Sequence, residues 1–415
     1  MRIFVESYGC TLNQGEGLEI NRSLSANHST VPEASQSDLV VINSCGVIER
    51  TERKILRRVK ELQRMGKEVI MTGCLPSINP HAVREAGIEM IAPIGDGQAI
   101  QDLIAKRFES RVGNNDKPDA ENFTIDDRQR VEAVVKIANG CLGNCSYCAT
   151  KNARGNLKSR YIEAILGDVE SAIAAGSKEI RLTAQDTAVF GMDNGSSLPF
   201  LLTAIGQIPG QFRVRVGMMN PLYTKTILEG LIEAYDNEVI YKFLHVPLQS
   251  GDDEVLKDMN RGYTVDDFKR IISKFRGRFD DLTISTDVIV GYPTESEDSF
   301  RKTYEFLEEI KPDIINITRF SPRPWTRAYE LKDMSDRIKK ERSRKFTILH
   351  KSLGSEINAK LVGKELGVLV TEPGKNGTLM GRTDTYKTVI LREGKLGDFM
   401  KVRIKDATSF YLVAE

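Results

Sequence analysis

The feature that most constrains the fold is an alternation of short apolar runs with helical patterns, which occurs twice along the chain. In the first stretch, residues 1 to about 105, the runs are Arg2–Ser7, Asp38–Asn43 and Glu68–Thr72. In the second, six runs are Val131–Ala138, Glu179–Thr183, Phe212–Met218, Tyr241–Leu248, Leu282–Val290 and Ile314–Phe320. Such alternation favours parallel sheets covered by helices. We therefore predict an N-terminal open parallel α/β domain and a central incomplete (β/α)6 barrel.

A polar segment separates these stretches, and a different pattern follows them. Residues 111–130 are rich in charged and polar residues, which is typical of a linker. A basic amphipathic helix is expected from Arg337 to about Lys360, and short strands then surround turn signals at Pro373–Gly377 and Arg392–Gly394. The predicted parts are an N-terminal domain (1–110), the linker (111–130), a central domain (131–350) and a small all-β barrel (351–415).

Composition is that of a folded globular protein. Of 415 residues, 40% are hydrophobic and 28% charged, and no apolar run approaches the roughly 18 residues that span a bilayer. Residues Met1 to Ser7 read as a strand and lack the layout of a signal peptide. We therefore expect no membrane segment and a cytoplasmic location, which keeps cysteines as thiols. Because the net charge is only +1, affinity for a polyanion must come from local basic patches.

Three cysteines, Cys141, Cys145 and Cys148, follow the first strand of the central stretch in one short loop. Thiolate is the usual ligand of iron-sulfur clusters, and three thiolates can hold three irons of a 4Fe-4S cubane. The fourth iron would stay open to a small ligand. A zinc site or a disulfide is the alternative, although His81 and His245 lie far away in sequence and a reducing compartment disfavours disulfides.

The other three cysteines share a position in the N-terminal stretch. Cys10, Cys45 and Cys74 each lie one to three residues beyond one of its predicted strands. The carboxyl ends of parallel strands meet at one edge of an open sheet, and ligands bind at that edge. The pattern therefore predicts a second three-cysteine cluster with one open iron. Three unrelated buried cysteines are the alternative, because free cysteine is often buried.

Polar residues also follow the strands of the central stretch, at the end where barrels of this kind carry their active sites. They are Gln185, Asp186, Asn220, Gln249, Ser250, Asp287 and Arg319. Each is either a functional group or an ordinary loop residue.

The C-terminal segment combines basic with aromatic side chains. They are Lys375, Arg382, Lys387, Lys401, Arg403 and Lys405 with Tyr386, Phe399, Phe410 and Tyr411. The combination suits single-stranded or loop RNA. A solvated charged face over core aromatics is the alternative.

Together these motifs resemble the radical S-adenosylmethionine (SAM) methylthiotransferases, over essentially the whole chain. The matching motifs are Ser7-Tyr-Gly-Cys10, Asn43-Ser-Cys45-Gly, Thr72-Gly-Cys74-Leu, Cys141 to Cys148 with Tyr147 before the last cysteine, His245–Gly251, Met259-Asn-Arg261 and Thr286–Gly291. Ser7–Asn13, Ala153–Arg160 and Arg215–Pro221 look like the archaeal and eukaryotic enzymes that act on N6-threonylcarbamoyladenosine in tRNA. Thr294 stands where the family usually has glycine, which leaves the geometry of that loop open.

The resemblance implies two 4Fe-4S clusters, on Cys141, Cys145 and Cys148 and on Cys10, Cys45 and Cys74, and a TRAM-type RNA-binding barrel at the C-terminus. It implies that SAM is held by Tyr147, Gln185, Asp186, Gln249, Arg261 and Asp287. Reductive cleavage of SAM would give a 5′-deoxyadenosyl radical that removes hydrogen from carbon-2 of adenine. Sulfur would come through the second cluster and the methyl group from a second SAM. Lys151 and Arg154 lie near substrate, tune the charge of the cluster, or are merely exposed.

The implied partners are the anticodon stem-loop of a tRNA, an unidentified electron donor and a sulfur source. The expected modification is methylthiolation of N6-threonylcarbamoyladenosine next to the anticodon. Isopentenyladenosine in tRNA or an aspartate of a ribosomal protein is the alternative substrate. An iron-sulfur protein that binds RNA or transfers electrons, without catalysis, is the alternative outside the enzyme class.

Overall fold

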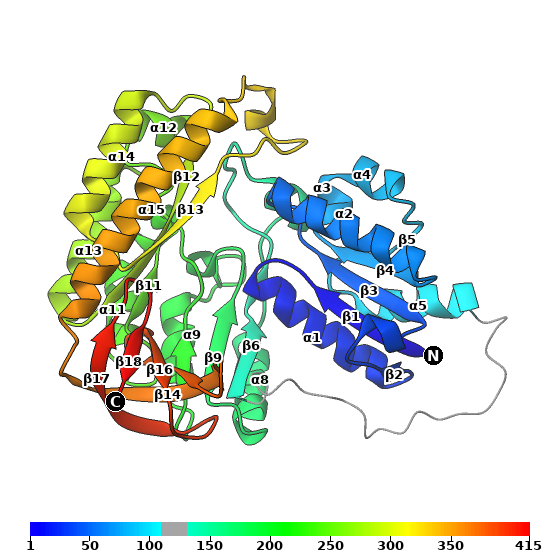
Figure 1. The fold of residues 1–415 in the computed structure, drawn as a ribbon, viewed down its shortest axis with the longest axis horizontal. Helices are drawn as coiled ribbons and strands as arrows, with labels where there is room; N and C mark the ends of the chain where they lie inside the picture. The colour runs from blue at the N-terminus through cyan, green and yellow to red at the C-terminus, as the bar shows by residue number, and fades with distance from the viewer. Residues whose placement is uncertain (109–130) are drawn as a thin grey trace. The chain divides into compact units, whose positions relative to one another are not determined.

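The computed structural model describes residues 1–108 and 131–415, which divide into two compact units (Figure 1). The first unit contains residues 1–108 together with Tyr147–Asn156 and Ser321–Tyr329, and the second contains the other described residues. The predicted linker, 111–130, lies outside the described residues. None of the described helices is both long enough and apolar enough to cross a bilayer.

The first unit is built on a parallel five-stranded sheet with the order β2-β1-β3-β4-β5. Its strands are β1 (Arg2–Ser7), β2 (Ser29–Thr30), β3 (Leu39–Ser44), β4 (Glu68–Gly73) and β5 (Met90–Ile91). The helices α1 (Thr11–Ser25) and α5 (Gly97–Phe108) cover one face, and α2 (Glu49–Arg64) and α4 (Pro80–Glu85) cover the other (Figure 1). The predicted open parallel α/β domain is confirmed.

The sequence of β3 explains why it lies at the centre of this sheet. All six of its residues are buried, as expected of a parallel strand with helices on both faces. Val40 and Ile42 pack in the cluster that contains Ile55 of α2, whereas Leu39 and Val41 pack on the opposite side of the sheet. Cys45 therefore directly follows a strand that is buried along its whole length.

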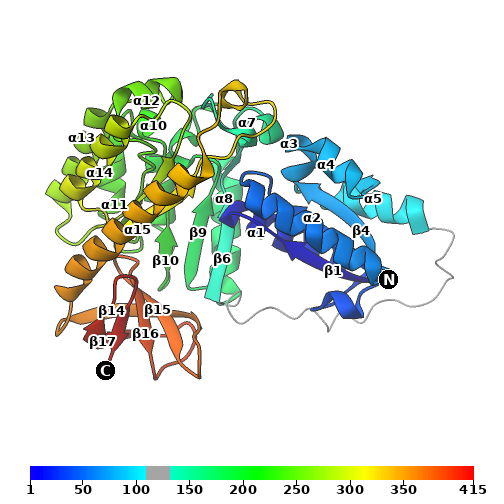
Figure 2. The same ribbon diagram turned by 45° about the horizontal axis from the view of Figure 1, so that its top comes forward.

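The central part of the second unit is an open arc of six parallel strands (Figure 2). β6 (Glu132–Lys136), β9 (Glu179–Thr183) and β10 (Arg213–Arg215) form one sheet, and β11 (Phe243–His245), β12 (Thr283–Val290) and β13 (Ile314–Arg319) form the other. A parallel bridge between Val214 and Ile240 joins the two sheets. This is the predicted incomplete barrel, with β10 and β11 shorter than their apolar runs.

Helices follow most of these strands, and all of them except α12 place apolar residues in or against one large core. They are α8 (Ile162–Ala174), α9 (Leu198–Ile205), α10 (Pro221–Thr224), α11 (Leu228–Tyr235), α12 (Asp253–Asp258), α13 (Val265–Arg278), α14 (Glu297–Ile310) and α15 (Asp336–Ala359). A small hairpin, β7 (Ala138–Asn139) with β8 (Lys158–Ser159), stands beside β6.

The C-terminal strands close into a separate small barrel in the order β14-β15-β16-β18-β17 (Figure 2). They are β14 (Glu365–Pro373), β15 (Leu379–Thr383), β16 (Thr388–Leu391), β17 (Phe399–Ala407) and β18 (Leu412–Ala414). The predicted all-β barrel is confirmed.

Three side chains of the predicted RNA-binding set are used inside the second unit. The ring of Tyr386 packs 4.9 Å from the rings of Tyr241 and Phe243, measured between centroids. Lys387 pairs with Asp313, and Arg382 pairs with Glu372. By contrast, Lys375, Lys401, Arg403, Lys405, Phe410 and Tyr411 are exposed. The alternative of a core aromatic therefore holds for Tyr386, and the exposed residues stay candidates for RNA contact.

The loop after β12 accommodates Thr294 without a strained backbone. The positive φ of this loop falls on Gly291, at +73°, and Thr294 is not among the residues with positive φ. The buried carboxylate of Glu295 accepts hydrogen bonds from the Gly291 N–H at 2.8 Å and from Arg342 at 2.6 Å. Threonine therefore fits where the family usually has glycine.

Candidate functional site

Three cysteines of the first unit gather at one edge of its sheet. β1, β3 and β4 are neighbours, and Cys10, Cys45 and Cys74 follow their carboxyl ends. Cys10 and Cys74 are also the residues at which α1 and α3 (Leu75–Ile78) begin. Each thiolate would act on the others electrostatically, because Cys10 and Cys45 both contribute to raising the pKa of Cys74. The three cysteines thus stand at the carboxyl ends of adjacent strands, and their joint ligation of one cluster stays a prediction.

Close backbone packing holds this edge together. Gly9 has φ +108°, and a Cβ at this position would lie 2.6 Å from the Cβ of Cys45, nearer than atoms pack, so only glycine fits. The side-chain amide of Asn13 donates to the carbonyl oxygens of Tyr8 and Ser44, both at 2.9 Å. The loops that carry Cys10 and Cys45 are thereby tied to each other.

Arg154 lies buried against this cysteine edge. It ends α7 (Ala149–Arg154), the helix that begins at Cys148, and its side chain is 1% exposed. Its Nε–H donates to the sulfur of Cys74 at 3.2 Å. Its terminal nitrogens donate to both carboxylate oxygens of Glu16, at 2.7 and 2.8 Å, and to Asn13. The guanidinium of Arg154, in the helix that follows Cys148, therefore donates directly to a cysteine of the set Cys10, Cys45 and Cys74.

Burial raises the pKa of two of these thiols, Cys45 and Cys74. It raises the pKa of Cys74 to about 11, and the nearby Arg154 opposes the shift. Burial also raises the pKa of Cys45. Because iron binds the thiolate, cluster assembly at this edge must release protons.

In the second unit, Cys141 and Cys145 flank Gly143. A Cβ built at Gly143 would lie 3.3 Å from the sulfur of Cys141 and 3.8 Å from that of Cys145. The Gly143 N–H points at the Cys141 sulfur, at 3.2 Å. A guanidinium nitrogen of Arg261 donates to the Cys145 sulfur at 3.1 Å. Both sulfurs are therefore held close together and supplied with N–H donors.

A chain of hydrogen bonds links these sulfurs to Asp186. Arg261 also donates to the amide oxygen of Asn220, at 3.4 Å. The Asn220 and Ala188 N–H groups both donate to one carboxylate oxygen of Asp186, at 3.0 Å. The other oxygen of Asp186 is buried without a hydrogen-bond partner. Asp186 and Arg261, both predicted site residues, thus belong to one polar group beside the cysteines.

Of the remaining predicted residues of this unit, Gln185 and Gln249 follow β9 and β11, whereas Asp287 lies within β12 and not at its end. Asp287 contacts Nε2 of His245 at 3.1 Å and accepts from Asn316 at 2.7 Å. Burial opposes its ionisation, but these hydrogen bonds outweigh burial and lower the pKa of Asp287. Gln249 has φ +66° and its N–H bonds to the Asp287 carbonyl. The side-chain oxygens of Gln249 and Gln185 are buried without partners.

Tyr147 and Cys148 belong to the first unit, whereas Cys141 and Cys145 belong to the second. The grouping of the three cysteines, and the role of Tyr147, therefore stay predictions from sequence spacing. Lys151 donates to Asn156 at 2.9 Å on the surface of the first unit.

Known proteins match this chain in all three of its parts. Family models match residues 2–93 (Uncharacterized protein family UPF0004), 135–307 (Radical SAM superfamily) and 359–415 (TRAM domain). A probable threonylcarbamoyladenosine tRNA methylthiotransferase of Archaeoglobus fulgidus is 46% identical over 100% of this chain and 98% of its own length. The chain belongs to the threonylcarbamoyladenosine tRNA methylthiotransferase family. The threonylcarbamoyladenosine tRNA methylthiotransferase of Drosophila melanogaster is 32% identical, over 100% of this chain and 77% of its own length.

A solved structure supports the fold of this methylthiotransferase. The radical SAM methyltransferase TsrM of Kitasatospora setae, which holds cobalamin and a 4Fe-4S cluster, matches with a TM-score of 0.59 at 14% identity, over 79% of this chain and 73% of that chain. At this identity the match concerns the fold alone. The radical SAM match itself supports an enzyme that uses SAM and iron-sulfur chemistry.

The donors present suit these cofactors. In residues 1–108 and 131–415, no three His, Cys, Asp or Glu side chains converge on one point as the ligands of a single metal ion do. A cubane binds its thiolates through separate irons, so its ligands need no common point. Among the described residues, side-chain oxygens of Gln185, Asp186 and Gln249 are buried without a hydrogen-bond partner, so each could accept from a ligand with N–H or O–H donors, such as SAM. Both cofactors of the methylthiotransferase therefore fit.

Sequence reasoning missed four residues of these sites: Asn13, Glu16, His245 and Asn316. Each acts by contacting a predicted residue through side chains that are distant in sequence, such as Glu16 and Arg154, 138 positions apart. Asn220 was noted as a strand-end residue but not assigned to the site. The motif Ser7–Asn13, in which Asn13 stands three positions after Cys10, was the one available signal for Asn13.

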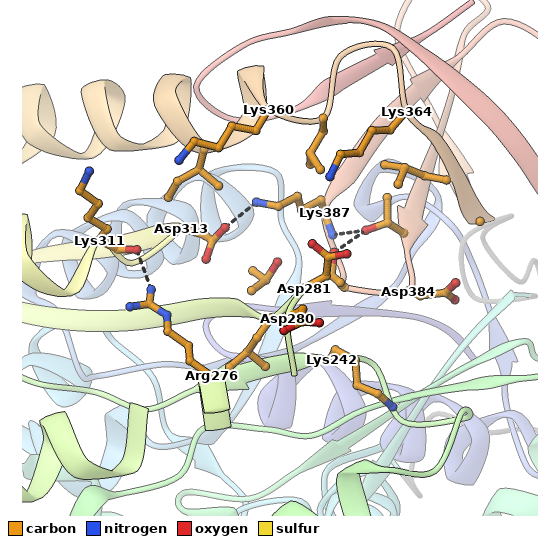
Figure 3. Close-up of a pocket in the computed structure, with 18 of the residues that line it drawn as sticks. Lys242, Arg276, Asp280, Asp281, Lys311, Asp313, Lys360, Lys364, Asp384 and Lys387 are labelled. Atoms are coloured by element: carbon orange, nitrogen blue, oxygen red, sulfur yellow. Dashed lines mark hydrogen bonds and ion pairs between the residues drawn. The ribbon is translucent and has the colours of Figure 1, made fainter. Parts of the chain in front are cut away.

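A hollow of about 700 Å³ lies at the opposite end of the central strands, where the C-terminal barrel meets β12 (Figure 3). Lys387 points across it to Asp313, at 2.5 Å, and Arg276 donates to the backbone carbonyl of Lys311. Its wall carries six basic and six acidic side chains, so it favours neither anions nor cations. It is separate from the carboxyl-end site.

Replacing Asp186 with asparagine is expected to stabilise the methylthiotransferase in the absence of SAM at pH 8. Burial raises the pKa of Asp186 to about 6, so the protonated carboxyl contributes to the free energy of unfolding at low pH. This contribution is lost as pH rises from about 4 to about 6. The neutral amide keeps the acceptor for Ala188 and Asn220 and removes a buried charge, a gain of about 2 to 3 kcal/mol. Calorimetry from pH 4 to 8 checks this, and an unchanged pH profile would contradict it.

Proposed function

We propose that this enzyme attaches a methylthio group to carbon-2 of N6-threonylcarbamoyladenosine next to the anticodon in tRNA, using SAM and two 4Fe-4S clusters. The observation that carries the proposal is the full-length identity to relatives named for this activity. The TRAM match supports RNA as the partner, as do the exposed basic and aromatic residues of β17 and its neighbours. The proposed domains 1–110, 131–350 and 351–415 each enclose one matched segment.

Each proposed cluster has its own cysteine set. Cys141, Cys145 and Cys148 would hold one, and Cys10, Cys45 and Cys74 the other. Bound there, the clusters supply the electron that cleaves SAM and a site for the sulfur to be inserted.

The remaining residues bind and orient. Gln185, Asp186 and Gln249 would accept hydrogen bonds from SAM, and Tyr147 would lie against its adenine. Arg261 connects the Cys145 sulfur to Asn220 and so fixes this group. Asp287, held by His245 and Asn316, presents a carboxylate that stays ionised at neutral pH.

Nucleoside analysis tests the substrate. Mass spectrometry of tRNA from cells that lack the gene should show loss of 2-methylthio-N6-threonylcarbamoyladenosine, with its unmethylthiolated precursor accumulating. Restoring the gene should restore the nucleoside. If this nucleoside is unchanged and the 2-methylthio derivative of isopentenyladenosine or a modified ribosomal aspartate is lost, the corresponding alternative is the substrate. The proposal also includes an electron donor, a sulfur source and a cytoplasmic location.

A further inference from the structure

One exposed helix face of the first unit has no role in the function above. On α2, the residues Arg50, Lys54, Arg57 and Arg64 are exposed. Their spacing places them in a single stripe along the helix, opposite the buried residues Ile55, Val59 and Leu62. The stripe extends over about 21 Å, at a rise of roughly 1.5 Å per residue. We call it the α2 basic stripe.

Within the described residues, ion pairs do not neutralise the positive charges of the α2 basic stripe. Glu49 pairs with Arg53, and Glu61 pairs with Arg58. Among the described residues, no carboxylate pairs with the four side chains of the stripe. Because the whole chain has a net charge of only +1, this is a local concentration of positive charge, the electrostatic footprint expected of polyanion binding.

The stripe also adjoins the cysteine edge of the sheet. α2 begins at Glu49, shortly after Cys45, and the ammonium of Lys54 lies 5.4 Å from the ring centroid of Tyr8, two positions before Cys10. A hollow of about 480 Å³ opens here. Tyr8, Lys54 and Arg57 line it together with Glu6 and Glu61, whose carboxylates both pair with Arg58. A polyanion on the stripe would therefore approach the cysteines, instead of lying at a remote surface.

We propose that the α2 basic stripe binds phosphates of the substrate tRNA, so that the first unit contacts RNA as well as supplying sulfur. The proposal rests on the proposed function, which makes tRNA the substrate. Charge complementarity selects RNA: four unpaired cations in a line match a phosphate backbone, and three of them are arginines, the side chain that fits phosphate through paired N–H donors. Phosphate contacts of this kind position RNA without reading its sequence.

Replacing the four stripe residues together tests the proposal. In the variant Arg50→Gln/Lys54→Gln/Arg57→Gln/Arg64→Gln, the affinity for tRNA should fall about tenfold or more near 0.1 M salt. The slope of log affinity against log salt should become shallower by roughly 3, because each phosphate contact contributes about 0.7 to 0.9. Fluorescence anisotropy of the full chain at several salt concentrations measures both. Glutamine preserves the helix.

A matched variant removes four charges elsewhere. Lys269, Arg270, Lys274 and Arg301, on α13 and α14, are exposed, and their change to glutamine should leave the affinity and the salt slope at wild-type values. Cleavage of SAM without RNA should be normal in both variants, which reports intact folding. A stripe variant with the wild-type salt slope overturns the proposal, even if an acidic protein binds there. Wild-type protein that binds and modifies no tRNA would instead overturn the proposed function.

Discussion

Replacing Cys10, Cys45 and Cys74 together with alanine is expected to abolish methylthiolation of tRNA while SAM is still cleaved to 5′-deoxyadenosine. The three thiols gather at one sheet edge, on loops separate from the Cys141 loop. Their loss should therefore remove one cluster and leave the other. Anaerobically reconstituted wild-type protein should hold about eight irons and the variant about four, counting one cubane per set.

The control replaces the other three cysteines and leaves Cys10, Cys45 and Cys74 in place. Replacing Cys141, Cys145 and Cys148 should abolish both cleavage of SAM and methylthiolation, with iron again near four. Liquid chromatography of 5′-deoxyadenosine, iron analysis and mass spectrometry of tRNA nucleosides give the three readouts. Four irons in the intact protein, or sulfur insertion by the first variant, would refute the second cluster.

Replacing Arg154 with methionine is expected to destabilise the first unit by about 3 to 5 kcal/mol, because it leaves the carboxylate of Glu16 buried without its partner. Both side chains are almost fully buried, at 1% and 2% exposed. The double variant Glu16→Gln/Arg154→Met removes both charges and should recover most of this loss. Thermal unfolding of the full chain compares the two. Equal destabilisation by the single and double variants would count against the ion pair.

Arg154 also donates to the Cys74 sulfur, so a second effect is expected at the cluster. Hydrogen bonds to cysteine sulfur stabilise the reduced, more negative form of an iron-sulfur cluster. Without this donor the reduction potential should shift to a more negative value in both variants. A redox titration followed by electron paramagnetic resonance, with Cys141, Cys145 and Cys148 replaced so that one cluster remains, isolates the effect. A merely structural arginine would leave the potential unchanged in the stable double variant.

The sequence predicted those features that depend on local pattern. β1 and β9 begin and end where their apolar runs do, because strand alternation is a short-range property. The gathering of Cys10, Cys45 and Cys74 was also predictable, since parallel strands bring their carboxyl ends to one edge whatever the length of the intervening helices.

Features that depend on docking between distant segments were not predictable. For Arg154, just past the Cys141–Cys148 motif, the sequence left open a place near substrate, an effect on the charge of that cluster, or simple exposure, yet its side chain contacts Cys74, 80 positions earlier. Tyr386 was grouped with residues that stack on RNA, but its hydroxyl donates to Glu179 inside the second unit. Nothing in local composition reveals such pairings.

The short helix α7 constrains how this sequence can vary. It begins directly after Cys148, ends at Arg154, and packs through Ala149 and Ala153 against Cys74 and Ile78. One inserted residue would turn Arg154 by about 100° around the helix axis, at roughly 3.6 residues per turn. Its guanidinium would then leave both Glu16 and Cys74. The distance along the chain from Cys148 to Arg154 is therefore fixed as firmly as the spacing between the cysteines themselves, and a search for functional relatives should require both.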